Sequence, residues 1–464
     1  MNSEKLYSTN PADNYNYLGV VVKSSPEEIK HNMYKAHVAK NEWGLLTVNQ
    51  RSEYLLPICE EFTRRSDELA ELITLETGKP IIQSKGEIEG YTEQIYDFMS
   101  QAKLALKAED NSFTDIEQDD KIIYEPKGAT AVIAPWNYPY GMAVWGIIPN
   151  LLAGNTVVFK TSEETPLVGK FIEEVFNKSQ LPDGVFNEIY GDSEQGEQLV
   201  RSAPDFVWFT GSTQTGMHIN KIASETNTPT LLEMGGSNPA VIFEDAEIDV
   251  SLQQIFNNRF ANNGQTCDAI KRLVVHKDVA PIIIDGLSSI IESSKIGNPL
   301  EEDTFFGSLV AKRQLNSLQY AVDESVANGS RIISPLSNVE TPGGAFMKPV
   351  LIEGINTVSD SVWRTEMFGP ILPIVTFEHE IEAVELANDT SYGLGALVVS
   401  QDEDRALRVA SKIKAGSVNI NSADHWNNAW NPFGGVKMSG NGREHGIHGM
   451  RQLTNIKVIS KPKT

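Results

Sequence analysis

Segments with hydrophobic residues at helical spacing alternate along this chain with short runs of β-branched and aromatic residues. Residues 25–28 (Ser-Pro-Glu-Glu) combine a capping serine, a proline at the first helical position and a glutamate at the third. This pattern predicts a helix that runs to about Trp43. A second helical pattern covers residues 51–75 and stops near Gly78 and Pro80, and further helix is expected to about Lys107.

After residue 120 the pattern alternates regularly between strand and helix. The expected strands cover 121–124, 128–134, 156–159, 185–189, 205–209, 240–243 and 273–276, and the helices among them cover 166–177, 196–201, 213–224 and 250–262. Such alternation predicts a mostly parallel, doubly wound sheet. The alternation restarts after 230–236, which indicates a second α/β domain, and the polar segment 111–120 before a strand predicts a protruding hairpin.

Length and charge restrict the classes of protein that fit. A chain of 464 residues favours two or three domains. The formal charge of −23 argues against nucleic acid or an anionic membrane as a partner. The uncharged stretch 128–159 is interrupted by prolines and asparagines, so it does not read as a membrane span. Two cysteines make no disulfide framework and the start lacks the apolar core of a signal peptide, so the cytoplasm is expected.

One of the two cysteines stands where a substrate could reach it. Cys59 lies in a helical pattern, where a small buried thiol is the ordinary interpretation. Cys267 lies in the polar segment 257–272, which contains Gly264 and connects an expected helix to an expected strand. Because the thiolate is the nucleophile, such a cysteine needs access and surroundings that favour the anion.

A glycine turn is the candidate cofactor site. Residues 211–216 (Gly-Ser-Thr-Gln-Thr-Gly) follow an expected strand and open an expected helix, whose free amides suit a phosphate. The segment is not the usual dinucleotide fingerprint, and a plain turn and helix cap stays open. Lys160 and Glu163 follow another strand at the edge where nucleotides bind, and Glu163 could accept hydrogen bonds from ribose; a solvated charge pair is the alternative.

Two further polar residues follow apolar runs. Glu233 lies between such a run and two glycines, so we expect partial burial to raise its pKa and make it a better general base. Asn137 stands between Pro135 and Pro139 after a strand, where its amide could donate to an oxyanion. A surface glutamate and a turn asparagine remain the alternatives.

Taken together and in order, seven short motifs resemble those of the aldehyde dehydrogenase superfamily, over nearly the whole chain. The chain length and the segment 442–449 are similar to those of compact bacterial succinate-semialdehyde dehydrogenases. The motifs are Glu-Thr-Gly-Lys-Pro at 76–80, Pro-Trp-Asn at 135–137, Phe-Thr-Gly-Ser at 209–212, Glu-Met-Gly-Gly at 233–236, Gly-Gln-Thr-Cys at 264–267, Glu-Met-Phe-Gly-Pro at 366–370 and Pro-Phe-Gly-Gly-Val-Lys at 432–437.

The resemblance implies a role for each matching residue. Cys267 is expected to add to the aldehyde, Asn137 and the Cys267 amide to hold the oxyanion, and Glu233 to activate the water that hydrolyses the thioester. NAD is the expected cofactor and NADP a possible one, because Glu163 would bind the ribose hydroxyls and repel a 2′-phosphate. The residues implied in cofactor binding are Trp136, Lys160, Glu163, Gly211, Ser212, Glu366 and Phe368.

The resemblance also implies a domain plan. Residues 1–107 and 127–232 would form a variant Rossmann cofactor-binding domain, and 233–437 a catalytic α/β domain. Residues 108–126 and 446–464 would form an oligomerisation element with a β-hairpin. A homodimer or homotetramer is therefore expected.

The residues expected around the substrate are uncharged. The succinate-semialdehyde enzymes place arginines where this chain has Trp145 and Ala261. Tyr138, Met142, Trp145 and Trp426 would form an aromatic tunnel, with core packing as the alternative for the tryptophans. A neutral aliphatic or aromatic aldehyde is expected, with succinate semialdehyde as the alternative, because a buried carboxylate without a partner is costly. Asp268 is expected to point away from the sulfur, since its charge would raise the pKa of the thiol.

Three other functions fit the sequence less well. A CoA-acylating dehydrogenase is disfavoured because that branch usually lacks the glutamate found here as Glu233. A non-catalytic structural or binding member is disfavoured because such proteins tend to lose the nucleophile. No metal is expected, since His445 and His448 lack neighbours with a ligand pattern.

Overall fold

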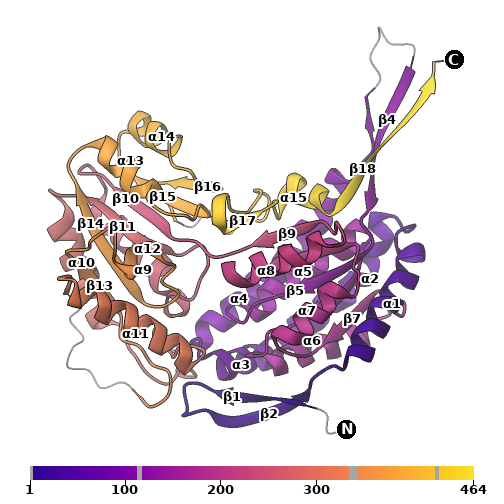
Figure 1. The fold of residues 1–464 in the computed structure, drawn as a ribbon, viewed down its shortest axis with the longest axis horizontal. Helices are drawn as coiled ribbons and strands as arrows, with labels where there is room; N and C mark the ends of the chain where they lie inside the picture. The colour runs from indigo at the N-terminus through magenta and orange to yellow at the C-terminus, as the bar shows by residue number, and fades with distance from the viewer. Residues whose placement is uncertain (1–3, 112–117, 334–341, 424–427, 464) are drawn as a thin grey trace.

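The computed structural model describes residues 4–111, 118–333, 342–423 and 428–463. Two mainly parallel sheets form the centres of its two lobes (Figure 1). The helices are α1 (Pro26–Trp43), α2 (Val48–Arg64), α3 (Ser66–Thr77), α4 (Ile81–Ala105), α5 (Pro139–Ala153), α6 (Pro166–Lys178), α7 (Ser193–Arg201), α8 (Thr213–Ser224), α9 (Ile248–Phe260), η1 (Ala261–Gly264), α10 (Ala280–Ser293), α11 (Lys312–Ala327), α12 (Ser361–Arg364), α13 (Glu380–Asn388), α14 (Glu403–Ala410), η4 (Lys437–Ser439) and α15 (Gly446–Gln452). None of these helices of the described chain is long and apolar enough to span a membrane.

The first sheet has six strands in the order β17-β9-β8-β5-β6-β7. All its neighbouring strands are parallel except β17, which is antiparallel to β9. Alternate residues of one strand pack on opposite faces: in β8, Trp208 lies in the core that contains α5, and Val207 and Phe209 lie in the core that contains α8. The strands are β5 (Ala129–Ile133), β6 (Thr156–Lys160), β7 (Phe186–Ile189), β8 (Phe206–Thr210), β9 (Thr230–Glu233) and β17 (Gly440–Asn441).

The second sheet has seven strands in the order β12-β13-β14-β11-β10-β15-β16. Only β12 is antiparallel to its neighbour. Apolar cores cover both faces of this sheet as well, so the predicted fold of two doubly wound α/β sheets is confirmed. The strands are β10 (Asn238–Ile242), β11 (Ile270–His276), β12 (Arg331–Ile332), β13 (Val350–Glu353), β14 (Ile371–Phe377), β15 (Gly395–Val399) and β16 (Ser417–Ile420).

Two smaller sheets complete the fold. β1 (Lys5–Asn10) and β2 (Asn16–Val22) form an antiparallel ribbon. β3 (Glu109–Asp110), β4 (Gln118–Pro126) and β18 (Thr454–Pro462) form a three-stranded sheet whose β4 and β18 project from the body of the molecule (Figure 1). The predicted protruding hairpin is confirmed in its strands β3 and β4, while residues 112–117 lie outside the described chain.

The first predicted helix is confirmed, and the second is wrong in one respect. Ser25 caps α1 and forms the full capping box with Glu28. The pattern at 51–75 predicted one helix, but the chain turns at Arg65 and separates α2 from α3. The Arg65 guanidinium lies 4.0 Å from the centre of the Phe171 ring on α6, a tertiary contact that hydrophobic spacing does not reveal.

A buried arginine links helix α9 to the irregular segment before β14. Arg259 is fully buried and donates to the backbone carbonyls of Met367 (3.1 Å), Ile371 (2.6 and 3.0 Å) and Gly369. The Met367 and Gly369 carbonyls lie before β14, and the Ile371 carbonyl belongs to its first residue. The Arg259 side chain therefore supplies hydrogen-bond donors where the regular pairing of this strand begins.

We expect Arg259→Met to lower the free energy of unfolding by about 2–4 kcal/mol, because it leaves several buried carbonyls without a donor. Equilibrium denaturation in urea measures this change. Arg64→Met serves as the matched control, since Arg64 is an exposed arginine whose partner Glu61 lies on the same helix. Equal stability of the two variants would contradict this account of the segment before β14.

Candidate active site

A cavity with a volume of about 570 Å³ contains Cys267. Its walls come from α4, α5, the carboxyl ends of strands in the first sheet, and the segments that precede β11 and β14. It brings together eleven of the residues singled out from the sequence: Trp136, Asn137, Tyr138, Met142, Trp145, Gly211, Ser212, Glu233, Cys267, Glu366 and Phe368. Lys160 and Glu163 do not line it, and Trp426 lies outside the described residues.

The segment before Cys267 has an unusual backbone. Asn262 and Asn263 have φ of 50° and 52°, and Gly264 has φ of 73°. Asparagine and glycine tolerate this left-handed region better than other residues do. A Cβ on Gly264 would lie 2.5 Å from the Gly369 carbonyl oxygen. The sequence of this segment is therefore matched to a compact turn that delivers Cys267 to the cavity.

Asn137 is fixed by this same turn. Its Nδ2 donates to the Gln265 backbone carbonyl at 3.0 Å, and the backbone carbonyl of Asn137 accepts from Asn262 Nδ2 at 2.9 Å. An amide nitrogen carries two hydrogens, so one donor of Asn137 remains for a ligand. The side chain lies in the cavity wall with Cys267.

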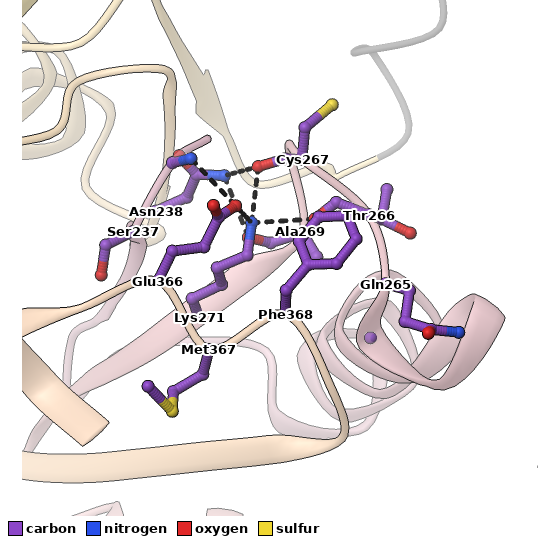
Figure 2. A network of polar contacts seen from close by, with 12 residues as sticks. Ser237, Asn238, Gln265, Thr266, Cys267, Ala269, Lys271, Glu366, Met367 and Phe368 are labelled. Carbon is purple, nitrogen blue, oxygen red and sulfur yellow. Dashed lines mark hydrogen bonds and ion pairs between the residues drawn. The ribbon is translucent and has the colours of Figure 1, made fainter. Parts of the chain in front are cut away.

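A buried lysine binds backbone carbonyls in the segment that carries Cys267. Lys271 Nζ donates to the carbonyls of Thr266 (2.8 Å) and Cys267 (2.6 Å) and forms an ion pair with Glu366 Oε1 (3.0 Å). Asn238 Nδ2 also donates to the Cys267 carbonyl at 3.1 Å. Figure 2 shows these contacts on one side of the Cys267 backbone, while its sulfur points away from Lys271. The thiol is thus left clear of the network that fixes its main chain.

The charged groups around Cys267 have opposite effects on the pKa of its thiol. Burial raises the pKa of its thiol well above the usual value, and the carboxylate of Asp268 raises it further, whereas the Lys271 ammonium lowers it. Asp268 also lines the cavity. The expectation that the Asp268 side chain points away from the sulfur stays a prediction, but its charge acts on the thiol and raises its pKa.

Glu233 ends β9 and is buried in the cavity wall. Burial raises the pKa of its carboxyl well above the usual value, and the carboxylate of Glu444 raises it further. Burial likewise raises the pKa of Glu444 to about 8. Two neighbouring buried carboxyls favour states in which at least one is protonated. The expected burial of Glu233 and the direction of its pKa shift agree with the structure.

The edge of the first sheet next to the cavity carries the expected cofactor residues. Gly211 and Ser212 lie at the start of α8, and Ser212 caps this helix by accepting from the Thr215 amide. Lys160 ends β6 and is buried, and its Nζ donates to the Thr161 carbonyl. Glu163 follows in an exposed turn. These positions all lie at the carboxyl ends of parallel strands, where open α/β sheets bind nucleotides.

Cavity residues from helix α4 were missed by the sequence analysis. Glu87, Tyr91 and Gln94 lie at i, i+4 and i+7 on one face of α4 and line the cavity. Gln94 accepts from Trp145 Nε1 at 2.7 Å. The helical spacing was a usable signal, but nothing in it distinguished a cavity face from a core face. Phe433, Glu444 and Lys271 were missed too, although each lies in a segment that had been quoted.

Glu87 connects α4 to the start of α5. Its Oε1 accepts from the amides of Tyr140 (3.1 Å) and Gly141 (3.0 Å), and its other oxygen forms a fully buried ion pair with Lys79. Lys79 Nζ lies 3.8 Å from the centre of the Tyr138 ring. This arrangement satisfies free amides at a helix start and fixes the aromatic wall.

Comparison with known proteins gives full-length matches. A model described as the aldehyde dehydrogenase family matches residues 1–459. The chloroplastic betaine aldehyde dehydrogenase of Beta vulgaris is 34% identical over 465 residues, which are 99% of this chain and 91% of that protein. The peroxisomal aminoaldehyde dehydrogenase 1 of Pisum sativum is 32% identical over 99% of this chain and 93% of its own length.

Solved structures match equally well. Betaine aldehyde dehydrogenase from Staphylococcus aureus in complex with NAD+ superposes with a TM-score of 0.93 and 31% identity, over 99% of this chain and 92% of that one. A structure titled as an NADP dependent enzyme of E. coli has a TM-score of 0.94 and 30% identity, over 99% and 95%.

Lys271→Met is expected to slow alkylation of Cys267 by iodoacetamide about threefold to tenfold near pH 8, because loss of the ammonium raises the pKa of the thiol and less thiolate is present. The pH–rate profile should shift to higher pH rather than only fall in amplitude. Lys277→Met is the control, since Lys277 pairs with Glu378 on the surface. An unshifted profile in Lys271→Met would show that its charge does not act on the sulfur.

Proposed function

Since the chain belongs to the aldehyde dehydrogenase family and is an NAD(P)-dependent aldehyde dehydrogenase, we propose that Cys267 is its nucleophile. The observation that carries this proposal is the cavity in which Cys267, Asn137 and Glu233 meet. Three residues from distant parts of the sequence there supply a thiol, an amide donor and a buried carboxyl. A family member that had lost its chemistry would have no need to keep all three.

The proposed reaction begins at the sulfur. The Cys267 thiolate bonds to the aldehyde carbon, and the former carbonyl oxygen becomes an alkoxide. The free Nδ2 hydrogen of Asn137 and the backbone amide of Cys267 donate to this oxygen. As the alkoxide reforms its carbonyl, the hydrogen on that carbon departs as hydride, and a thioester remains on Cys267. NAD(P), when bound, supplies the acceptor for this hydride.

Hydrolysis completes the cycle. Glu233, in its ionised form, accepts a proton from water as the water oxygen bonds to the thioester carbon. The carbon–sulfur bond then breaks, which releases the carboxylic acid and restores the Cys267 thiolate. The raised pKa of Glu233 makes it a stronger base for this step, and Glu444 beside it contributes to that rise.

The cofactor proposal depends on the edge of the first sheet. Gly211 and Ser212 lie just before α8, whose first-turn amides would meet a diphosphate. The Gly211 amide itself donates to the Glu233 carbonyl at 3.0 Å, and a Cβ on Gly211 would lie 2.5 Å from the Phe209 ring. Lys160 and Glu163 would take the adenine ribose, and Glu366 with Phe368 and Trp136 the nicotinamide end. Glu163 favours NAD over NADP because its charge repels a 2′-phosphate.

The charged residues that line the cavity restrict which aldehydes can bind. Of the lining residues that the structure describes, five are carboxylic acids and none is lysine or arginine. An aldehyde with its own carboxylate would therefore lack a partner, which disfavours succinate semialdehyde. Aromatic walls formed by Tyr138 and Trp145 favour a neutral aldehyde, as expected from the sequence. The relatives named for betaine aldehyde and aminoaldehydes support adding positively charged aldehydes to this class.

Three further aspects of function are proposals. Residues 1–107 and 127–232 form the cofactor-binding domain, 233–437 the catalytic domain, and 108–126 with 446–464 an oligomerisation element. The projecting strand β18 exposes Ile456, Val458 and Ile459 by half or more, which supports a homodimer or homotetramer assembled on this arm. The free thiols of both cysteines suit a reducing compartment such as the cytoplasm.

We expect NADH formation, followed at 340 nm, with butyraldehyde or benzaldehyde and NAD, and its loss in Cys267→Ala. Succinate semialdehyde should be oxidised with at least about tenfold lower kcat/KM, because a carboxylate without a partner is costly to bury. Cys59→Ala is the matched control and should stay active, since Cys59 lies in the core away from the cavity. Comparable kcat/KM with NAD and NADP would remove the cofactor preference.

Glu233→Gln is expected to release one equivalent of NADH per active site in a burst and then to turn over at least about 100-fold more slowly, because the amide cannot accept the proton of water. Mass spectrometry of the intact protein should find the acyl group on Cys267 after the burst. Exposed Glu225→Gln, at the end of α8, is the control. Steady turnover without an acyl-enzyme in Glu233→Gln would assign hydrolysis to another group.

A further inference from the structure

Asp268 places a negative charge beside the nucleophile; burial raises the pKa of its carboxyl, and the charge of Lys271 opposes this rise. Asp268 lines the cavity together with Cys267. Among the described residues, none forms an ion pair with it: the nearest ammonium in sequence, that of Lys271, is directed to two backbone carbonyls and to Glu366. An ionised carboxylate held in a largely buried cavity without a cation is unfavourable, so a cationic ligand would gain from meeting it.

The walls near Asp268 are aromatic. Tyr91 lies 5.3 Å from Trp145 and 6.3 Å from Tyr138 between ring centres, and Trp145 lies 5.5 Å from Phe433. All four rings line the cavity. After burial, which is the largest effect, the charge of Asp268 is among the groups that raise the pKa of both Tyr91 and Tyr138, so this charge acts on the aromatic wall.

A carboxylate among aromatic rings selects for one kind of group. Aromatic faces attract cations, most strongly where water is excluded, and they also accommodate the methyl or methylene groups that an ammonium carries. The same rings provide few of the oxygen ligands that a hard metal ion requires. The surroundings of Asp268 therefore fit an organic ammonium better than a metal ion or a second carboxylate.

We propose that Asp268 is a specificity-determining residue that selects aldehydes with an ammonium group a few bonds from the carbonyl. This inference rests on the proposed function, because it requires the aldehyde carbon to reach Cys267. Consecutive Cα atoms are only about 3.8 Å apart, so a cation held by Asp268 lies near the carbon that bonds to the sulfur. Short ammonium aldehydes satisfy both contacts at once, and long ones do not.

A cation bound at Asp268 also offsets the rise that this carboxylate causes in the pKa of the Cys267 thiol. The charge of Asp268 raises the pKa of the Cys267 thiol, second only to burial. An ammonium bound at Asp268 opposes this effect, so the preferred substrate itself favours the thiolate that attacks it. A neutral aldehyde of the same shape fills the cavity without this benefit.

Two isosteric aldehydes test the proposal. Betaine aldehyde and 3,3-dimethylbutanal differ in that a trimethylammonium group in the first replaces a tert-butyl group in the second. The measured quantity is the ratio of kcat/KM for the cation to kcat/KM for the neutral isostere, compared between wild type and Asp268→Asn. Because each ratio is compared across variants, the different hydration of the two aldehydes in water cancels.

We expect Asp268→Asn to lower this ratio at least tenfold and Asp268→Glu, which keeps the charge, to retain most of it. A purely structural role would change both aldehydes alike, and an unchanged ratio in Asp268→Asn would overturn the proposal. Failure of the proposed function gives a different result: no NADH from either aldehyde in the wild-type enzyme.

Discussion

The structure depends on buried cations that satisfy backbone carbonyls where regular pairing stops. The segments before β11 and β14 carry Cys267 and Glu366, and neither segment has strand partners along its length. Arg259 supplies donors to the carbonyls before β14, and Lys271 supplies them to the carbonyls of Thr266 and Cys267. A buried carbonyl without a donor is costly, so these side chains make the irregular segments stable enough to hold a reactive group in place.

Several carboxyl groups line the cavity without a close cation. Among the described residues, no lysine or arginine forms an ion pair with Asp268, Glu233 or Glu444, although the charges of Lys271 and Arg443 lower the pKa of the first two. Burial then raises the pKa of each carboxyl. In the proposed mechanism this is useful at Glu233, where a stronger base is needed, and at Asp268 it becomes useful when the substrate brings the missing charge.

Much of the fold could be predicted from the sequence, because local signals and global structure agree. The capping box at Ser25, the stop at Gly78 and the short runs of β-branched and aromatic residues that form the strands of the first sheet were all visible in the sequence. The turn at Arg65 was not, and there the Arg65 guanidinium contacts Phe171 on another helix, which local sequence does not reveal. Hydrophobic spacing indicates which face of a helix or strand is buried. It does not indicate where a helix ends because of a contact with a neighbouring helix.

The residues of the candidate site could likewise be predicted only in part from the sequence. Asn137 and Glu233 could be singled out from their places at the ends of apolar strands, and Cys267 from the polar segment that connects a helix to a strand. Lys271 and Asp268 could not be assigned from spacing, because their directions depend on partners far along the chain, Glu366 for the first and the aromatic wall for the second. Asp268 is expected to point away from the sulfur because its charge is unfavourable there, yet Asp268 lines the cavity with Cys267 and raises the pKa of the thiol.

The late position of β17 in the sequence has a consequence for biosynthesis. Gly440 and Asn441 pair with the end of β9, next to Glu233, and the following Glu444 forms part of the cavity wall. A ribosome therefore makes the nucleophile long before the segment that encloses it. Until residues 440–444 are made, β9 lacks β17 and the cavity lacks the wall formed by Glu444, so the chain can enclose its reaction chamber only after this segment emerges.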